Sequence, residues 1–189
     1  MHNLARENHL KIHTDGARIF NASVALNVEV KELAQFTDSI TFCLSKGLAA
    51  PIGSMVCGTQ EFIYFARRTR KILGGGMRQV GILASAGLVS ISKMVNKLKL
   101  DHENLTQLAN GLAQFKEIDI NPDDFKTNIL FFGLKNTSIN DEELVFKMDK
   151  LGVRFFALSK NKFRLVTHSG VHNDDINYTL NAFSNVFNS

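Results

Sequence analysis

The apolar segment Ser39–Leu44 constrains the fold more than any other part of this 189-residue chain. Its residues are nearly all β-branched, aromatic or apolar, which is typical of a parallel strand covered on both faces. A shorter strand is expected at Leu10–Thr14, and Val30–Phe36, which lies between the two, fits a short helix. Strand, helix and strand in this order predict a βαβ unit and therefore an α/β fold.

Several further elements are expected to complete a first domain over residues 1–95. The pattern predicts a third strand at Gly53–Gly58, a helix at Gln60–Leu73 that stops at Gly74–Gly76, and a long helix from Val80 to Leu98. We expect a partial mixed sheet, mostly parallel, with helices around it. Because Leu4, Ala5 and Leu10 resemble the tail of a helix that runs directly into a strand, we also expect sequence upstream of Met1 to be missing.

Residues 96–189 are expected to form a small α+β domain. An amphipathic segment (Leu105–Phe115) leads to a turn at Asn121–Asp123, and a strand is expected at Thr127–Leu134. The pattern next predicts a helix opened by Asn140 or Asp141 and closed by Gly152. It ends with strands at Val153–Leu158 and Lys162–Thr167, and with a helix whose inward residues are Ile176, Leu180, Phe183 and Phe187.

The composition bears on the cellular compartment. Cys43 and Cys57 have no metal-ligand spacing, and one pair makes no disulfide framework, so we expect reduced thiols. The N-terminal stretch MHNLARENHLK is polar and unlike a signal peptide, and no apolar run approaches the length of a membrane span. We therefore expect a cytoplasmic protein that does not enter a membrane.

The charge balance is mildly basic, with a net charge of +4 and a pI of about 9.1. This excess suits nucleic acid and anionic small molecules equally. Most charge runs on helices are solvated faces, and we interpret Arg67 and Arg68 in this way. We expect no nucleic-acid partner, because the chain has no known motif and because Tyr64 and Phe65 should pack in the core.

Known ligand motifs are few. The glycine triplet Gly74–Gly76 is neither a Walker loop nor a dinucleotide fingerprint. His168 and His172 lie across a strand-to-helix turn, so we expect no metal site and treat them as satisfied or exposed side chains.

The first two predicted strands each run into residues that carry chemistry. Thr14 is followed by Asp15-Gly16, and Leu44 is followed by Ser45-Lys46-Gly47. A right-handed crossover places the carboxyl ends of adjacent parallel strands at the same edge of a sheet, where open α/β sheets bind ligands. A lysine amine and a carboxylate at one crevice suit pyridoxal phosphate (PLP), whose aldehyde needs an amine and whose ring nitrogen needs an anion. Each motif alone also fits an ordinary turn or surface loop.

Four strings carry a resemblance to a known family. They are HTDGARIFNA (His13–Ala22), CLSKGLAAPIGS (Cys43–Ser54), RRTRKILGGGMRQVGILASAG (Arg67–Gly87) and RLVTH (Arg164–His168). In this order and at these separations they resemble the low-specificity L-threonine aldolases. The resemblance runs from about residue 5 to the C-terminus. It implies the PLP-dependent transferase fold of type I, of which this chain would be the middle and the end.

The resemblance also implies roles for six residues. Lys46 would be the Schiff-base lysine, Asp15 would pair with the ring nitrogen, and Arg18 would lie beside the cofactor and the substrate. Arg164, at a strand end in the small domain, would clamp the substrate carboxylate, which its guanidinium fork suits. Lys71 and Arg78 would lie at the rim of an active site, that of a neighbouring subunit.

The implied activity is an aldehyde-lyase that cleaves L-threonine or L-allo-threonine, which are β-hydroxy amino acids, to glycine and acetaldehyde. This would serve threonine catabolism and glycine biosynthesis in a homotetramer whose sites lie near subunit interfaces. Two alternatives stay open: a catalytically incomplete fragment, and a related PLP enzyme that performs β-elimination or transamination. The chain departs from the family at Ala49, where glycine is usual, and at Ser169-Gly170; we expect little effect from either. A larger departure is the lack of an N-terminal region, which would hold the cofactor phosphate and supply a ring-stacking histidine.

Overall fold

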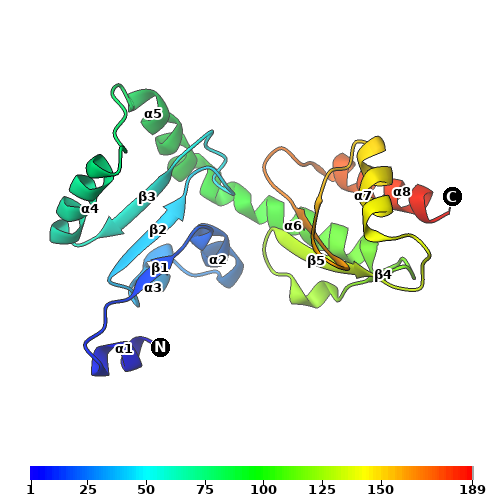
Figure 1. Cartoon of the computed structure of the whole chain (residues 1–189), viewed down its shortest axis with the longest axis horizontal. Coiled ribbons are helices and arrows are strands. Elements are labelled where there is room, and N and C mark those ends of the chain that lie inside the picture. The colour runs from blue at the N-terminus through cyan, green and yellow to red at the C-terminus, as the bar shows by residue number, and fades with distance from the viewer. Residues whose placement is uncertain (189) are drawn as a thin grey trace. The chain divides into compact units, whose positions relative to one another are not determined.

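The computed structural model describes residues 1–188 and divides the chain into two compact units, Met1–Leu98 and a second that begins at Lys99. Figure 1 labels most of the helices and strands of both units. Within the described residues, no helix is both long enough and apolar enough to cross a membrane.

The first unit is built on a three-stranded sheet of order β1-β2-β3. Its elements are α1 (His2–Glu7), β1 (His13–Asp15), α2 (Ile19–Leu26), α3 (Val30–Ala34), β2 (Ser39–Cys43), β3 (Ser54–Gly58), α4 (Gln60–Ile72) and α5 (Gly81–Val89). The parallel pairing of β1 with β2, in which His13 lies opposite Ser39, confirms the predicted βαβ unit. The crossover also contains α2, which the sequence did not reveal.

The prediction of a mostly parallel sheet is wrong. β3 runs antiparallel to β2, with Cys43 opposite Ser54 and Ser39 opposite Gly58. The reason lies in the connection, since the residues between Cys43 and Ser54 form no helix. A parallel return needs a crossover of a dozen or more residues, whereas a short loop returns the chain antiparallel.

The helical region after α5 is irregular. A π-helical turn, η1 (Ser90–Met94), and a 3₁₀ turn, η2 (Val95–Lys97), connect α5 to α6 (Leu98–Leu112). Side chains explain part of this irregularity: the hydroxyl of Ser90 donates to the carbonyl of Ala86 at 3.0 Å, and that of Ser92 to the carbonyl of Leu88 at 2.7 Å. Such bonds compete with the backbone ladder and bend helices. The predicted long helix therefore forms with a break in its geometry.

The second unit contains an entirely antiparallel four-stranded sheet of order β4-β5-β7-β6. Besides α6, its elements are β4 (Ile118–Asp119), η3 (Pro122–Asp124), β5 (Ile129–Leu134), α7 (Asp141–Lys150), β6 (Phe156–Ser159), β7 (Lys162–Val166) and α8 (Asn173–Phe187). Most of these were predicted; β4, which has only two residues, was not. The sheet order leaves β4 and β6 as its two edges.

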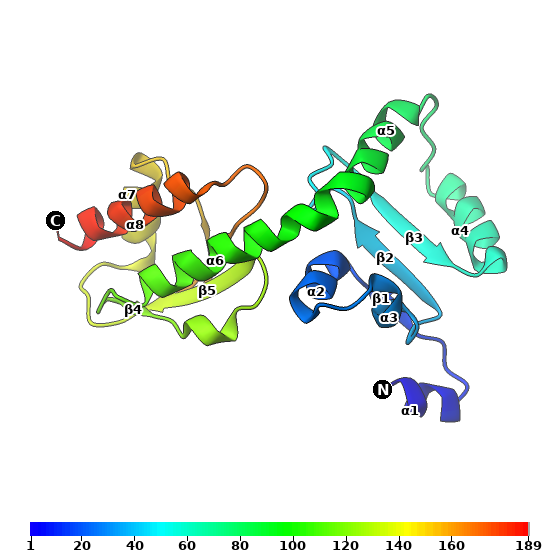
Figure 2. The same ribbon diagram turned by 180° about the vertical axis from the view of Figure 1, so that it is seen from behind.

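The core of the second unit lies between its sheet and its helices (Figure 2). Leu130 of β5 and Phe163 of β7 are fully buried with Leu105 of α6, Leu144 of α7 and Phe183 of α8. The start of α7 follows the prediction, because Asn140 caps it by accepting a hydrogen bond from the backbone N–H of Glu143 at 2.9 Å.

Candidate active site at the carboxyl ends of β1 and β2

The carboxyl ends of β1 and β2 bring two of the predicted site residues to one sheet edge. Asp15 is the last residue of β1 and lies opposite Thr41 of β2. β2 ends at Cys43, and Lys46 follows it in the next loop. Since the two strands are parallel and adjacent, both ends lie at the same edge of the sheet (Figure 1). Both side chains are exposed to solvent.

A close approach of the two strands fixes the position of Asp15. The N–H of Gly16 donates to the carbonyl of Thr41 at 2.8 Å. A Cβ atom at Gly16 would lie 2.8 Å from Cδ1 of Ile40 and 2.9 Å from the carbonyl oxygen of Thr41, so only glycine fits here. One carboxylate oxygen of Asp15 accepts from the N–H of Ala17 at 3.1 Å. The turn thus presents the carboxylate outward on a rigid support.

The loop that carries Lys46 is anchored by its neighbours. Leu44 and Leu48 are buried, and the N–H of Ala49 donates to the carbonyl of Lys46 at 2.9 Å. Gly47 is buried against α2: a Cβ atom there would lie 2.7 Å from Oδ1 of Asn21. Within residues 1–188 the amine of Lys46 forms no hydrogen bond or ion pair. A fixed backbone therefore carries an amine that is open to a ligand.

Arg18 lies three residues after Asp15, where α2 begins. It is half buried and belongs to the same strand-end turn, in which the carbonyl of Ala17 accepts from the N–H of Cys43 at 3.4 Å. The structure therefore places Arg18 next to the edge that holds Asp15.

Lys71 and Arg78 lie on a different segment. Lys71 is in the last turn of α4, and Arg78 lies in the loop before α5; both are exposed. The loop turns at Gly74, whose φ is +85°. No hydrogen bond or ion pair in the described part of the chain joins either residue to Asp15 or Lys46.

Two sequence expectations about α4 fail or stay open. Tyr64 and Phe65 are exposed, so the prediction that they pack in the core is wrong. α4 has no buried residue at all. The expectation of no nucleic-acid partner now depends on the lack of a known motif alone.

Arg164 lies in the second unit, and its predicted place at a strand end is wrong. It is the middle residue of β7, between Phe131 of β5 and Phe156 of β6. The side chain is half buried, and its Nε atom is buried without a hydrogen-bond partner in the described part of the chain. Buried polar nitrogens are rarely left unsatisfied, so this atom is suited to receive an anionic ligand.

A buried polar network near the end of β7 was not found from the sequence. Nδ2 of Asn128 donates to the carbonyl of Thr167 at 2.7 Å, and the Thr167 hydroxyl donates to the carbonyl of Asp101 at 2.6 Å. Burial raises the pKa of Asp101, and the nearby His168 opposes that shift. Burial also lowers the pKa of His102. The only sequence signal for this network was the polar residue Asn128 next to an apolar strand, and this signal is weak.

The donor set at the edge of the first sheet fits part of a PLP site. The amine of Lys46 suits the aldehyde, and the carboxylate of Asp15 suits a protonated ring nitrogen. Gly16 and Gly47 bring the backbone close on either side, where a Cβ atom would clash. Among residues 1–188 no group of three or more His, Cys, Asp or Glu side chains could hold a metal ion.

Comparison with known proteins identifies the family that the chain matches. A family model described as beta-eliminating lyase matches residues 1–134. The chain is 41% identical over 187 residues to the probable low-specificity L-threonine aldolase 2 of Arabidopsis thaliana, covering 98% of this chain and 53% of that protein. It is also 41% identical over 172 residues to the low specificity L-threonine aldolase of Escherichia coli O157:H7, covering 90% and 49%. The chain thus spans about half the length of these relatives.

Solved structures agree on the fold. A putative L-allo-threonine aldolase from Listeria monocytogenes superposes with a TM-score of 0.80 at 15% identity, covering 98% of this chain and 54% of that one. A putative aromatic amino acid beta-eliminating lyase/threonine aldolase from Exiguobacterium gives 0.81 at 18% identity, covering 98% and 55%. At such low identity this likeness shows a shared α/β fold.

Proposed function

The chain belongs to the beta-eliminating lyase family, which is PLP-dependent, and we propose that it carries the cofactor lysine of an aldehyde-lyase of the threonine aldolase type. The observation that carries this proposal is the convergence of Asp15 and Lys46 at one edge of the first sheet. The reaction would cleave L-threonine or L-allo-threonine to glycine and acetaldehyde. When bound, PLP would supply an electron sink for the bond that breaks.

Each candidate residue has a distinct task in this proposal. The amine of Lys46 would hold the cofactor aldehyde covalently, and the carboxylate of Asp15 would keep the ring nitrogen protonated. Arg18, from the same strand-end turn, would contact the cofactor ring and the substrate. Arg164 would bind the substrate carboxylate, since a guanidinium group binds carboxylates with two parallel hydrogen bonds. Lys71 and Arg78 would serve the rim of an active site.

An oligomer is part of the proposal. α4, α5 and the loop between them expose apolar side chains such as Leu73 and Ile82, which are 81% and 77% exposed. Exposed apolar surface of this kind is typical of protein interfaces. It supports a homotetramer with sites near subunit interfaces, in which Lys71 and Arg78 act on a neighbouring copy. We place this enzyme in the cytoplasm, in threonine catabolism and glycine formation.

A second candidate function is a catalytically incomplete fragment. The observation that favours it is coverage, since the chain spans about half the length of the relatives it matches. Binding of PLP by the chain itself separates the two possibilities.

The experiment is a spectral titration of the purified chain with PLP. Wild type should develop an absorbance band near roughly 420 nm, which is expected when PLP bonds to a lysine amine. Lys46→Ala should lack the band, whereas the control Lys31→Ala, which removes an exposed lysine of α3, should keep it. Borohydride reduction followed by peptide mass analysis would then locate the label on Lys46. A band that is equal in all three proteins would contradict the proposal.

The reaction is tested separately. Glycine and acetaldehyde released from L-threonine would support the aldolase reaction. Pyruvate released from L-serine, with no acetaldehyde released from L-threonine, would favour β-elimination, and a labelled chain that releases none of these products would favour the incomplete fragment.

A further inference from the structure

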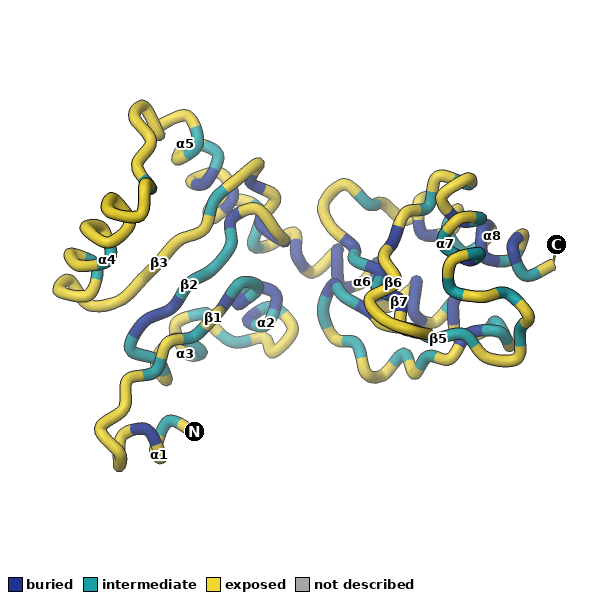
Figure 3. Tube along the Cα trace, in the orientation of Figure 1, coloured by how far each residue is buried: buried dark blue, intermediate teal, exposed yellow. Residues whose placement is uncertain are grey.

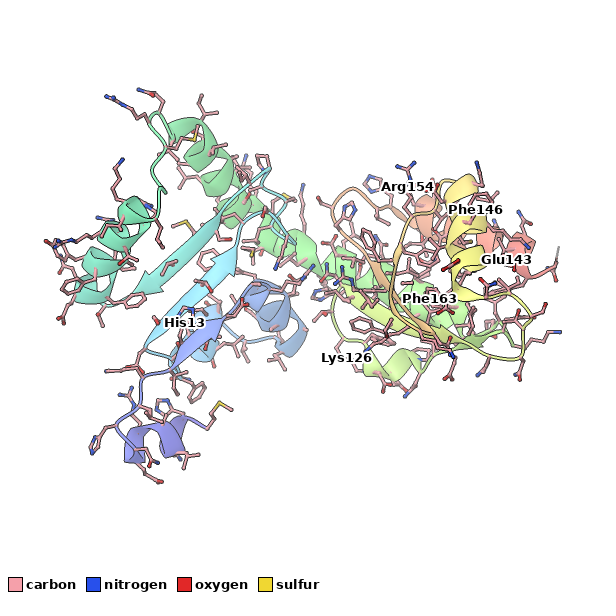
Figure 4. All side chains as sticks on the ribbon, viewed as in Figure 1. His13, Lys126, Glu143, Phe146, Arg154 and Phe163 are labelled. Carbon is pink, nitrogen blue, oxygen red and sulfur yellow. The ribbon has the colours of Figure 1, made fainter. Side chains whose placement is uncertain are left out.

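The four-stranded sheet of the second unit has one face in the core and one outside it. Leu130 and Phe132 of β5 and Phe163 and Leu165 of β7 are buried in the core. Side chains alternate between the faces of a strand, so Phe131 and Arg164 lie on the opposite, outer face. Figure 4 shows Phe163 within the crowded interior of this unit.

On the outer face, Arg164 is placed between two aromatic residues. Phe131 lies directly opposite Arg164 on β5, and Phe156 lies directly opposite it on β6. Residues directly opposite in neighbouring strands have Cβ atoms about 5 Å apart, so both rings are within reach of the guanidinium group. Phe131 is 37% exposed and Phe156 is 70% exposed. The outer face thus presents one cation with an accessible aromatic side chain on either side.

The charge on this face is incompletely matched. The buried Nε of Arg164 has no hydrogen-bond partner in the described residues. Lys162, two positions earlier in β7, places its amine 5.2 Å from the centre of the Phe131 ring and adds a second cation. Phe125 supports the same ring, with centres 6.4 Å apart. An anion would satisfy the nitrogen, and an apolar body would cover the rings.

We propose that Phe131 and Phe156, together with Arg164, form a site for a carboxylate carried on a flat apolar body. Arg164 binds the carboxylate, and the two rings flank the group attached to it. The assignment of a carboxylate to Arg164 rests on the proposed function. The role of the two rings is additional: they select ligands whose carboxylate lies close to an aromatic or other bulky apolar group.

The chemistry of the site favours this ligand over a purely polar one. An aromatic ring gains from offset or edge contacts with another ring, and such contacts are selective beyond the area they bury. The guanidinium group of Arg164 offers a planar fork of N–H donors that matches a carboxylate. A small carboxylate such as acetate would satisfy the nitrogen and leave both rings in water. A benzoate ion would satisfy both requirements.

The test measures carboxylate binding to the whole chain without cofactor or substrate. The probes are sodium acetate and sodium benzoate, followed through the ¹⁵N–¹H signal of the Arg164 Nε–H group, which the variant Arg164→Lys identifies by its loss. We expect benzoate to bind about fivefold more tightly than acetate, as ring contacts of ordinary strength give. Phe156→Ala and Phe131→Ala should each bring the ratio of the two affinities toward one.

Tyr178 provides the control. It is an aromatic residue of α8 that is 56% exposed, and it is not part of the three-strand register around Arg164. Tyr178→Ala should leave the ratio unchanged. Phe156 is 70% exposed, so Phe156→Ala should fold, and the dispersion of the backbone amide signals would verify this.

The outcomes separate the two levels of the proposal. If acetate does not shift the Arg164 signal, the carboxylate role of Arg164 in the proposed function is wrong, and the aromatic site falls with it. If acetate binds through Arg164 but benzoate gains nothing, the proposed function stands and the aromatic site is wrong. An equal loss in the Phe156→Ala and Tyr178→Ala proteins would also overturn the site.

Discussion

The two units of this chain bury their apolar residues very differently, as Figure 3 shows. The second unit has one continuous core that joins its sheet to three helices, with Phe163, Phe183 and Leu144 fully buried. The first unit has a small cluster around Leu44 and Leu48, while β3 and α4 are largely exposed. The second unit is therefore stabilised by a large core of its own, between its sheet and its helices. The first unit, which carries the candidate active site, has only a small core.

The largest expected effect tests this contrast directly. Phe163→Ala should lower the free energy of unfolding of the second unit by about 3–5 kcal/mol, because it leaves a cavity in a packed core. The matched change Phe65→Ala, at a residue of α4 that is 53% exposed, should cost less than about 0.5 kcal/mol. Both free-energy changes can be measured by urea unfolding followed by far-ultraviolet circular dichroism, since the chain has no tryptophan for fluorescence. Similar losses in the two variants would show that the units do not differ in packing.

The next prediction concerns the buried network at the end of β7. Asn128→Ala should cost about 1–3 kcal/mol, because it leaves the buried carbonyl of Thr167 without its donor. The control is Asn177→Ala, which removes an exposed hydrogen bond from Nε2 of Gln107 and should be nearly neutral. Chemical unfolding of the three proteins in parallel provides the comparison. A neutral Asn128→Ala would mean that another group or water satisfies the carbonyl.

Asp101 should make the stability of the second unit depend on pH. Burial raises the pKa of its carboxyl above the ordinary value of 3.8, so the folded state binds the proton more tightly than the unfolded state. The stability that this proton contributes is complete below pH 3.8 and is lost as the pH rises through the raised folded value. Asp101→Asn should therefore raise the unfolding temperature at pH 7 and lose this advantage at pH 3.5. The two pH values lie roughly above and below the range in which the carboxyl of Asp101 titrates.

Two controls sharpen the Asp101 prediction. His168 opposes the raised pKa of Asp101, so His168→Gln should increase the advantage of Asp101→Asn. Asp174, an exposed residue in the first turn of α8, should give no comparable gain on substitution by asparagine. An advantage of Asp101→Asn that is the same at both pH values would contradict a raised pKa.

The sequence predicted the elements whose periodicity agrees with their burial. β2, α7 and α8 lie close to the expected positions, because each has a repeating apolar face and, for α7, a capping asparagine. α2 was missed, since its buried face includes Asn21 and Ser23, which are polar and weak helix formers. The direction of β3 depends on the length and conformation of a loop, and strand patterns do not contain this information.

The candidate site was also predictable only in part. Strand order and a right-handed crossover were enough to bring Asp15 and Lys46 to one edge. The neighbours of Arg164 were not predictable, because its register with Phe131 and Phe156 arises from strands that lie apart in sequence. Tyr64 and Phe65 show a related failure: an apolar helical face was assigned to the core, although nothing within the described chain covers it.

The smallest expected effect lies in the loop of Lys46. Ala49 has a φ of +57°, in the left-handed region, which costs an L-residue with a side chain roughly 1 kcal/mol and glycine almost nothing. Ala49→Gly should therefore stabilise the first unit by about 0.5 kcal/mol, after the greater entropy of glycine in the unfolded chain is subtracted. The neighbouring change Ala50→Gly should instead destabilise it, because Ala50 is buried and has no positive φ.

The N–H of Ala50 donates to the carbonyl of Leu44, and the N–H of Leu44 donates to the carbonyl of Gly53. Hydrogen exchange of these two amides therefore reports the local stability of the loop that carries Lys46. Slower exchange in Ala49→Gly and faster exchange of the Leu44 amide in Ala50→Gly would show that strain at Ala49 weakens the support of Lys46. If Ala49→Gly exchanges faster than wild type, the left-handed turn is not strained, and the weakness of the first unit lies in its small core alone.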